Sequence, residues 1–201
     1  MRTTPTFLFM LLACTSAYAE SSPPAPWTAD VEARFGAVAP TSKLGAMVIG
    51  GVELDYLTPA LDHRLAIGLD LSLTRPSHAG SVMDPRVPGD AQYTIAETEM
   101  VIAVLASYRF ADNEATVVPW VAVGPMLHLL RSTETTSIAP GENTAVSSEP
   151  GIELAVGGDY RVGPGFLVGE LRAVYSKLDH AITGSTNAGT IAASVGYRLV
   201  F

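Results

Sequence analysis

Apolar and polar residues alternate with a period of two along most of the chain after residue 26. From Trp27 to Ala37, every second residue is apolar and the residues between are mostly polar. Because successive side chains of a β-strand point to opposite faces, such a segment predicts a strand with one apolar face. The pattern predicts eight strands, at Trp27–Ala37, Ala46–Leu57, Arg64–Thr74, Thr94–Phe110, Val117–Leu130, Ile152–Arg161, Leu167–Leu178 and Thr190–Phe201.

The links between these segments alternate between short and long. The short ones contain Pro, Gly, Asn or Asp and are typical of turns: Thr58–His63, Ala111–Thr116 and Val162–Pro164. The long ones are polar: Arg75–Tyr93, Arg131–Pro150 and Asp179–Ala188. Pro40–Gly45 is the exception, because it is a short link at the end of the meander where the other links are long. This alternation predicts an antiparallel up-and-down meander with its long links at one end.

Charged residues on the polar faces of the predicted strands decide which kind of barrel such a meander forms. A soluble barrel turns its charges outward, whereas a membrane barrel turns them inward. All basic residues of this set are arginines, and the only lysines of the whole chain are Lys43 and Lys177. Arginine suits interior ion pairs because its guanidinium group can bind a carboxylate through two hydrogen bonds. We therefore predict a polar network in the interior made of Asp30, Glu32, Arg34, Glu53, Asp55, Arg64, Asp70, Glu97, Glu99, Arg109, Glu153, Asp159, Arg161, Glu170, Arg172 and Arg198.

Aromatic residues gather at the strand ends, as the two interfaces of a membrane select. The short-turn end collects Trp27, Tyr56, Tyr108, Phe110, Tyr160, Phe166, Tyr197 and Phe201. Phe35 and Tyr175 are expected near the opposite end. The alternation and the aromatic placement together predict an all-β, eight-stranded antiparallel transmembrane barrel.

The N-terminus has the features of a secretory signal peptide. Arg2 precedes the apolar run Phe7–Ala13, and Ala17, Tyr18 and Ala19 form a cleavage site after Ala19. We predict a signal peptide at residues 1–19, a short segment at 20–26 and one barrel domain at 27–201. An alternative is a lipoprotein signal in which Cys14 is acylated. No later apolar run reaches eighteen residues, so no transmembrane helix is expected in the mature chain.

Composition and spacing exclude several function classes. The net charge of −8 argues against nucleic-acid binding, which needs clustered Lys and Arg. His63, His78, His128 and His180 have no metal-ligand spacing, so neither a metal nor another cofactor is expected. Asp179 and His180 with Ser176 or Ser185 form a weak Ser-His-Asp candidate for an enzyme acting on outer-leaflet lipid. No feature orients the histidine, and we expect no catalytic residues.

Residues 27–201 resemble the small outer-membrane β-barrels of Gram-negative bacteria, of the OmpA, OmpX and OmpW type. The resemblance depends on the eight-strand pattern and on the terminus, where Val195, Tyr197, Leu199 and Phe201 are similar to the sorting signal of such proteins. It implies export to the outer membrane, contact with outer-membrane lipid and recognition by the barrel-assembly machinery during biogenesis.

The interior of an eight-stranded barrel is just wide enough for its own side chains. We therefore expect a non-enzymatic barrel that acts as a structural element, an anchor or a binding protein through its loops, although no motif identifies an extracellular ligand. The alternatives are a narrow channel or carrier for small or hydrophobic solutes, as the OmpW resemblance allows, and a soluble periplasmic barrel.

Overall fold

The computed structural model describes residues 28–41, 45–83, 89–112, 114–137, 141–177 and 189–201. The predicted signal peptide, its cleavage at Ala19, the alternative at Cys14 and the candidate pair Asp179 and His180 lie outside these residues. So do Trp27, Lys43 and Ser185. The described part contains no helix long and apolar enough to cross a membrane.

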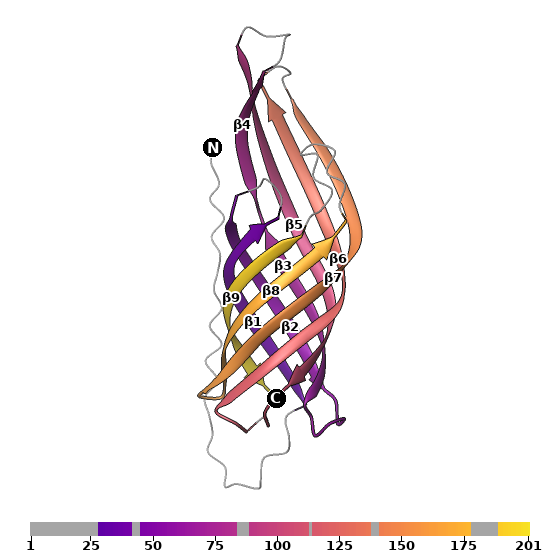
Figure 1. Ribbon diagram of the computed structural model, residues 1–201, viewed down its shortest axis with the longest axis vertical. Helices are drawn as coiled ribbons and strands as arrows, with labels where there is room; N and C mark the ends of the chain where they lie inside the picture. The colour runs from indigo at the N-terminus through magenta and orange to yellow at the C-terminus, as the bar shows by residue number, and fades with distance from the viewer. Residues whose placement is uncertain (1–27, 42–44, 84–88, 113, 138–140, 178–188) are drawn as a thin grey trace.

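The described residues form one antiparallel β-sheet that closes on itself (Figure 1). Its strands are β1 (Ala29–Pro40), β2 (Met47–Leu57), β3 (Leu65–Thr74), β4 (Ser77–Met83), β5 (Asp90–Arg109), β6 (Val117–Thr136), β7 (Glu142–Val162), β8 (Gly165–Ser176) and β9 (Thr190–Val200). Each barrel strand pairs with its neighbours in sequence, and β9 pairs with β1 to close the barrel.

Strands β3 and β4 are two parts of one strand, interrupted at Arg75 and Pro76. The pairing with β5 continues in the same register across the interruption, from Thr74 opposite Glu99 to Ser77 opposite Ala96. Pro76 has no N–H to donate, but its carbonyl oxygen accepts the N–H of Glu97 at 2.8 Å. The prediction of an eight-stranded up-and-down barrel is therefore confirmed.

The barrel is narrow. When the pairing is followed from strand to strand around the sheet, Ala29 leads back to β1 at Ala39, ten residues further along. A barrel of eight strands with this stagger encloses a space that its own side chains can fill.

Three strands are much longer than the others. β1, β2, β3, β8 and β9 have 12, 11, 10, 12 and 11 residues, close to the length that crosses a bilayer when tilted by about 45°. β5, β6 and β7 have 20, 20 and 21 residues. Their additional residues, together with β4, extend above the barrel as a sheet that we call the arm (Figure 1).

The arm corrects part of the sequence analysis. The predicted long links Arg75–Tyr93 and Arg131–Pro150 consist largely of strand. β4 and the start of β5 occupy the first link, and the end of β6 and the start of β7 occupy the second. Residues 142–150 of β7 are exposed or nearly so on both faces. A strand with water on both sides does not need an alternating sequence, which is why the pattern failed to reveal it.

The two faces of the barrel wall differ sharply in chemistry. Large apolar side chains point outward and stay exposed on every barrel strand, among them Leu54, Leu69, Val104, Val156 and Leu171. Acidic groups on the same strands, such as Asp70 and Glu153, are completely buried inside. The apolar face is therefore the outer one, as predicted.

Aromatic residues ring the outer face at the end where β9 finishes. Tyr56, Phe110, Tyr160 and Phe201 are exposed there, and Tyr108 packs edge-to-face on Phe110. Phe166 departs from the prediction because its side chain is completely buried inside the barrel, where it lies 4.8 Å below the guanidinium of Arg161.

Candidate functional site

The most distinctive feature of the molecule is the charged interior of the barrel, which we call the lumen. The structure buries fourteen of the sixteen residues of the predicted network: Asp30, Glu32, Arg34, Glu53, Asp55, Asp70, Glu97, Glu99, Arg109, Glu153, Asp159, Glu170, Arg172 and Arg198. They come from seven of the eight barrel strands, and β6 contributes none of them. Period-two alternation places each of them on the inner face.

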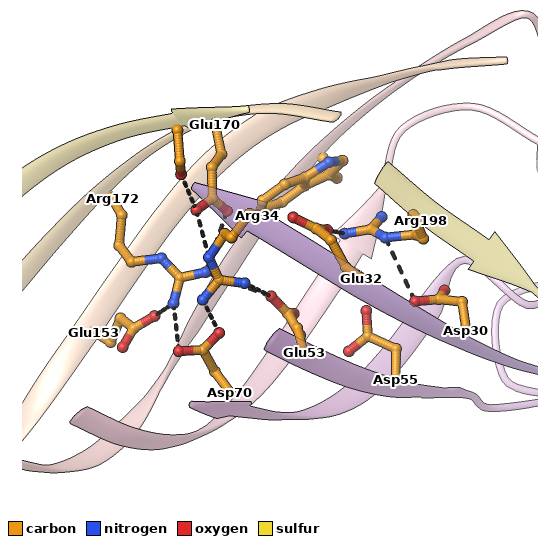
Figure 2. A network of polar contacts seen from close by, with 12 residues as sticks. Asp30, Glu32, Arg34, Glu53, Asp55, Asp70, Glu153, Glu170, Arg172 and Arg198 are labelled. Atoms are coloured by element: carbon orange, nitrogen blue, oxygen red, sulfur yellow. Dashed lines mark hydrogen bonds and ion pairs between the residues drawn. The ribbon is translucent and has the colours of Figure 1, made fainter. Parts of the chain in front are cut away.

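A central cluster is built around two guanidinium groups. Arg34 Nη1 lies 3.1 Å from Glu53 and its Nε lies 3.0 Å from Glu170, and a further nitrogen contacts Asp70. Arg172 contacts the same three carboxylates, at 3.4 Å from Glu53, 2.8 Å from Asp70 and 3.2 Å from Glu170, and also contacts Glu153. Figure 2 shows the two arginines side by side with the acids around them.

A lower cluster lies nearer to the end of β9. Arg198 pairs with Glu32 at 2.6 Å, with Asp159 at 2.5 Å and with Asp30 at 3.4 Å. Arg109 lies 2.7 Å from Asp30 and also faces Asp159, at 3.9 Å. Asp55 completes this cluster and approaches Arg109 at 4.0 Å.

The part of the lumen nearest to the arm has less charge. His128 is buried with its Nε2 3.6 Å from Glu99 Oε2, and Ser132 donates a hydrogen bond of 3.1 Å to Glu97. Glu99, His128 and Arg172 line a cavity of about 10 Å³. This is the space that one water molecule needs.

Arg64 and Arg161 lie outside the central and lower clusters described above. Arg64 precedes β3 in a turn, where its side chain is 34% exposed and pairs with Asp112 at 2.6 Å. Arg161 sits at the end of β7 above the ring of Phe166. Both arginines occupy inward-facing positions in the alternating pattern, but they lie at the rim, where the barrel opens to solvent.

Several interior residues were not predicted. The indole Nε1 of Trp120 donates a hydrogen bond of 2.7 Å to Asp159, and the hydroxyl of Ser194 donates one of 2.6 Å to Glu170. Gly157 makes room for the indole, because a Cβ there would lie 2.5 Å from the Trp120 ring. An indole in a predicted strand interior, with an inward glycine on the next strand, is the sequence signal that could have revealed this contact.

Comparisons with known proteins find similarity at the level of the fold. No family model and no curated protein matches the chain. Among solved structures, Neisserial surface protein A matches with a TM-score of 0.53 at 19% identity, over 86% of this chain and 97% of that one. The N-terminal β-barrel domain of Pseudomonas aeruginosa OprF matches with a TM-score of 0.50 at 14% identity, over 87% of this chain and 97% of that domain.

The chain has the fold of the eight-stranded outer-membrane β-barrels. In a barrel of this fold the charged lumen lies at the level of the membrane, enclosed by a wall whose outer face is apolar.

The lumen holds two clusters of buried ion pairs. Each cluster sets four carboxylates around two guanidinium groups. Paired and hydrogen-bonded charges are tolerated in a buried site, whereas a charge left alone there is costly. Among the described residues no group of three or more acidic, His or Cys side chains is arranged to hold a metal ion. The arrangement therefore supports a role in closing and stabilising the barrel.

Proposed function

We propose that this protein is an integral outer-membrane barrel with a closed lumen that anchors the arm at the cell surface, where the arm presents binding surfaces to partners. The observation that carries the proposal is the inversion of the barrel wall: exposed apolar side chains cover the outside, and fourteen charged residues are buried inside. A protein surrounded by water gains nothing from this arrangement, whereas a lipid bilayer requires it.

The ion-pair clusters favour an anchor over a channel. Side chains of Arg34 and Arg172 reach across the lumen from β1 and β8 to acids on β2, β3 and β7. The lower cluster crosses the lumen a second time. A solute would have to separate both sets of buried ion pairs, and each separation would leave charges without partners at a cost of several kcal/mol.

The arm supplies the surface for binding. Its strands continue beyond the barrel by about ten residues, which corresponds to roughly 30 Å at the rise of a β-strand. Along residues 142–150, β7 pairs only with β6 within the described part, because pairing with β8 starts at Gly151. Among the residues that the structure describes, β4 pairs only with β5. Each of these strands thus has an edge that no described strand occupies, to which an extended segment of a partner can add by backbone hydrogen bonds.

Cell fractionation combined with gel mobility tests the anchor. The protein should remain in the membrane pellet after washing with carbonate or urea. It should also migrate faster on gels when it is not heated, because a closed barrel resists unfolding by detergent. Extraction without detergent, or a mobility that does not change on heating, would show that the chain is a soluble barrel instead.

Two further measurements separate the remaining alternatives. In planar bilayers the purified protein should give no stable conductance, and regular single-channel steps would establish the narrow channel instead. The proposal includes no enzymatic activity, so lipid A from cells with and without the protein should have the same mass spectrum. A consistent change of acyl chains between the two would refute this part.

Removing the arm tests where binding takes place. A variant with β4–β5 and β6–β7 shortened to the height at which β3 ends should still show heat-dependent mobility. It should lose whatever cell-surface interaction the complete protein has, measured as attachment of intact bacteria to immobilised host or matrix proteins. Equal attachment by the two proteins would exclude the arm as the binding surface.

A further inference from the structure

The outer face of the barrel carries an apolar depression below the level of the arm. It has a volume of about 340 Å³ and is lined by Gly50, Val52, Leu71, Leu73 and Met100. The depression is open at Gly50, because a Cβ at this position would meet no atom within 4 Å. Its size is at the lower end of the range of sites that hold small molecules.

Two arginines stand directly above this depression. Register places Arg75 opposite Thr98, between the pairs Thr74–Glu99 and Ser77–Ala96, and places Thr98 opposite Arg131. The three residues thus form one row that runs from the interruption between β3 and β4 across β5 to β6. Both arginines are exposed and share the outward-facing alternation. With one strand between them, their Cα atoms are about 10 Å apart, so two long side chains can reach one ligand.

Among the described residues, the nearest outward-facing rows above and below this arginine pair contain no acidic group. The row below it is Leu73, Met100 and Leu129, and the row above it is Ser77, Ala96 and Thr133. Within the described residues neither guanidinium forms an ion pair, in contrast to those in the lumen. A chain with a net charge of −8 therefore exposes two unneutralised positive charges at the upper boundary of its apolar band.

We propose that this surface, formed by Arg75, Arg131 and the depression at Gly50, binds the lipid A part of lipopolysaccharide. The guanidinium groups would hold a lipid A phosphate, for which planar bidentate donors are well suited, and one acyl chain would lie in the depression. Lipid A is the phosphate-bearing lipid of the outer leaflet, and the arm end of the barrel faces that leaflet under the proposed function, on which this inference rests.

Lys177 provides a matched control. It follows β8 on the outward-facing alternation and is exposed. Strand β7 lies between it and β6, the strand that carries Arg131. The register places Lys177 level with Leu127, four residues below Arg131 along β6. If lipid A binds to any positive charge around the rim, replacing Lys177 should weaken binding as much as replacing either arginine. If the arginine row and the depression form a specific site, replacing Lys177 should leave lipid A binding unchanged.

Native mass spectrometry of the full-length folded protein in detergent, titrated with purified lipid A, measures the binding. We expect the double variant Arg75→Gln with Arg131→Gln to bind about tenfold more weakly, a difference of about 1.4 kcal/mol. Gly50→Leu, which fills the depression, should weaken binding without affecting the barrel. Lys177→Gln should bind lipid A as tightly as the original protein. The original protein and the double variant should bind dephosphorylated lipid A with equal affinity.

The possible failures can be told apart. If the double variant binds lipid A as well as the original protein, if Lys177→Gln weakens binding equally, or if phosphatidylglycerol competes on equal terms, the site is refuted. Gel mobility with and without heating is recorded for each variant and reports the barrel independently of lipid. A chain that shows heat-dependent mobility but binds no lipid A refutes the site alone, whereas loss of that mobility in the original protein refutes the membrane barrel.

Discussion

Replacing Arg172 by methionine is the sharpest test of the lumen network. The side chain is buried in the central cluster and contacts Glu53, Asp70 and Glu170 at 3.4, 2.8 and 3.2 Å, in addition to Glu153. Methionine keeps most of the volume but removes the charge. Four carboxylates would then face only Arg34. Breaking a buried ion pair by removing one partner costs about 3–5 kcal/mol, and we expect the free energy of unfolding to fall by this amount.

The same reasoning predicts a different result for an acid of the cluster. Four carboxylates surround two guanidinium groups, so Glu153→Gln removes a contact with Arg172 but also removes repulsion from Asp70, which shares the same Arg172 nitrogen. The two effects oppose each other, and the stability should change by no more than about 1 kcal/mol. When Arg172→Met is already present, Glu153→Gln should restore about 1 kcal/mol or more, because it removes a carboxylate that has lost its partner.

Reversible unfolding by urea in lipid vesicles or micelles, followed by tryptophan fluorescence, measures all three variants. Arg64→Gln is the control, since its ion pair with Asp112 lies at the exposed rim and its loss should produce no measurable change. A loss below about 1 kcal/mol for Arg172→Met would refute a dry network. It would mean that water fills the lumen and screens the acids, and the argument for a closed barrel would then fail.

Three further changes probe the wall and the end of the barrel. Gly157→Ala should destabilise the barrel by about 1–3 kcal/mol and shift the tryptophan emission, because the new Cβ meets the Trp120 ring, whereas Gly158→Ala, with open space around it, should do neither. Trp120→Phe leaves Asp159 without its indole donor and should cost about 1–3 kcal/mol in the same urea titration. Phe201→Ser should lower the amount assembled in the outer membrane of cells but leave refolding in detergent unchanged. Equal loss in both assays would contradict a sorting role.

Alternation in the sequence was sufficient to predict the barrel and the direction of its side chains. Leu69, Asp70 and Leu71 alternate strictly, so their faces follow from the geometry of a strand alone. The same alternation also assigned Arg64 and Arg161 to the lumen, because it gives a direction but no height along the barrel. Height depends on the tilt and stagger of the strands, and these are fixed by pairings between residues far apart in the sequence.

The partners within the lumen could not be predicted for a related reason. Arg34 on β1 meets Asp70 on β3 and Glu170 on β8, none of which lies on the same strand or shares a short turn with it. Such contacts form across the lumen and depend on the full register. Glycines such as Gly157 make room for these contacts, here for the Trp120 ring. In the sequence alone, such a glycine cannot be distinguished from one that only weakens a strand.

The barrel and the arm solve the problem of exposed strand edges in different ways. Closure between β1 and β9 removes every edge in the barrel. In the part of the chain that the structure describes, β4 and residues 142–150 of β7 each keep one unpaired edge. Unprotected edges of neighbouring copies would pair with each other. On β7 this edge carries Glu142, Glu149 and Pro150, and both like charge and a missing N–H oppose addition of a second copy. The β7 edge of the arm can therefore remain open to a partner of complementary charge without pairing with the same edge of a neighbouring copy.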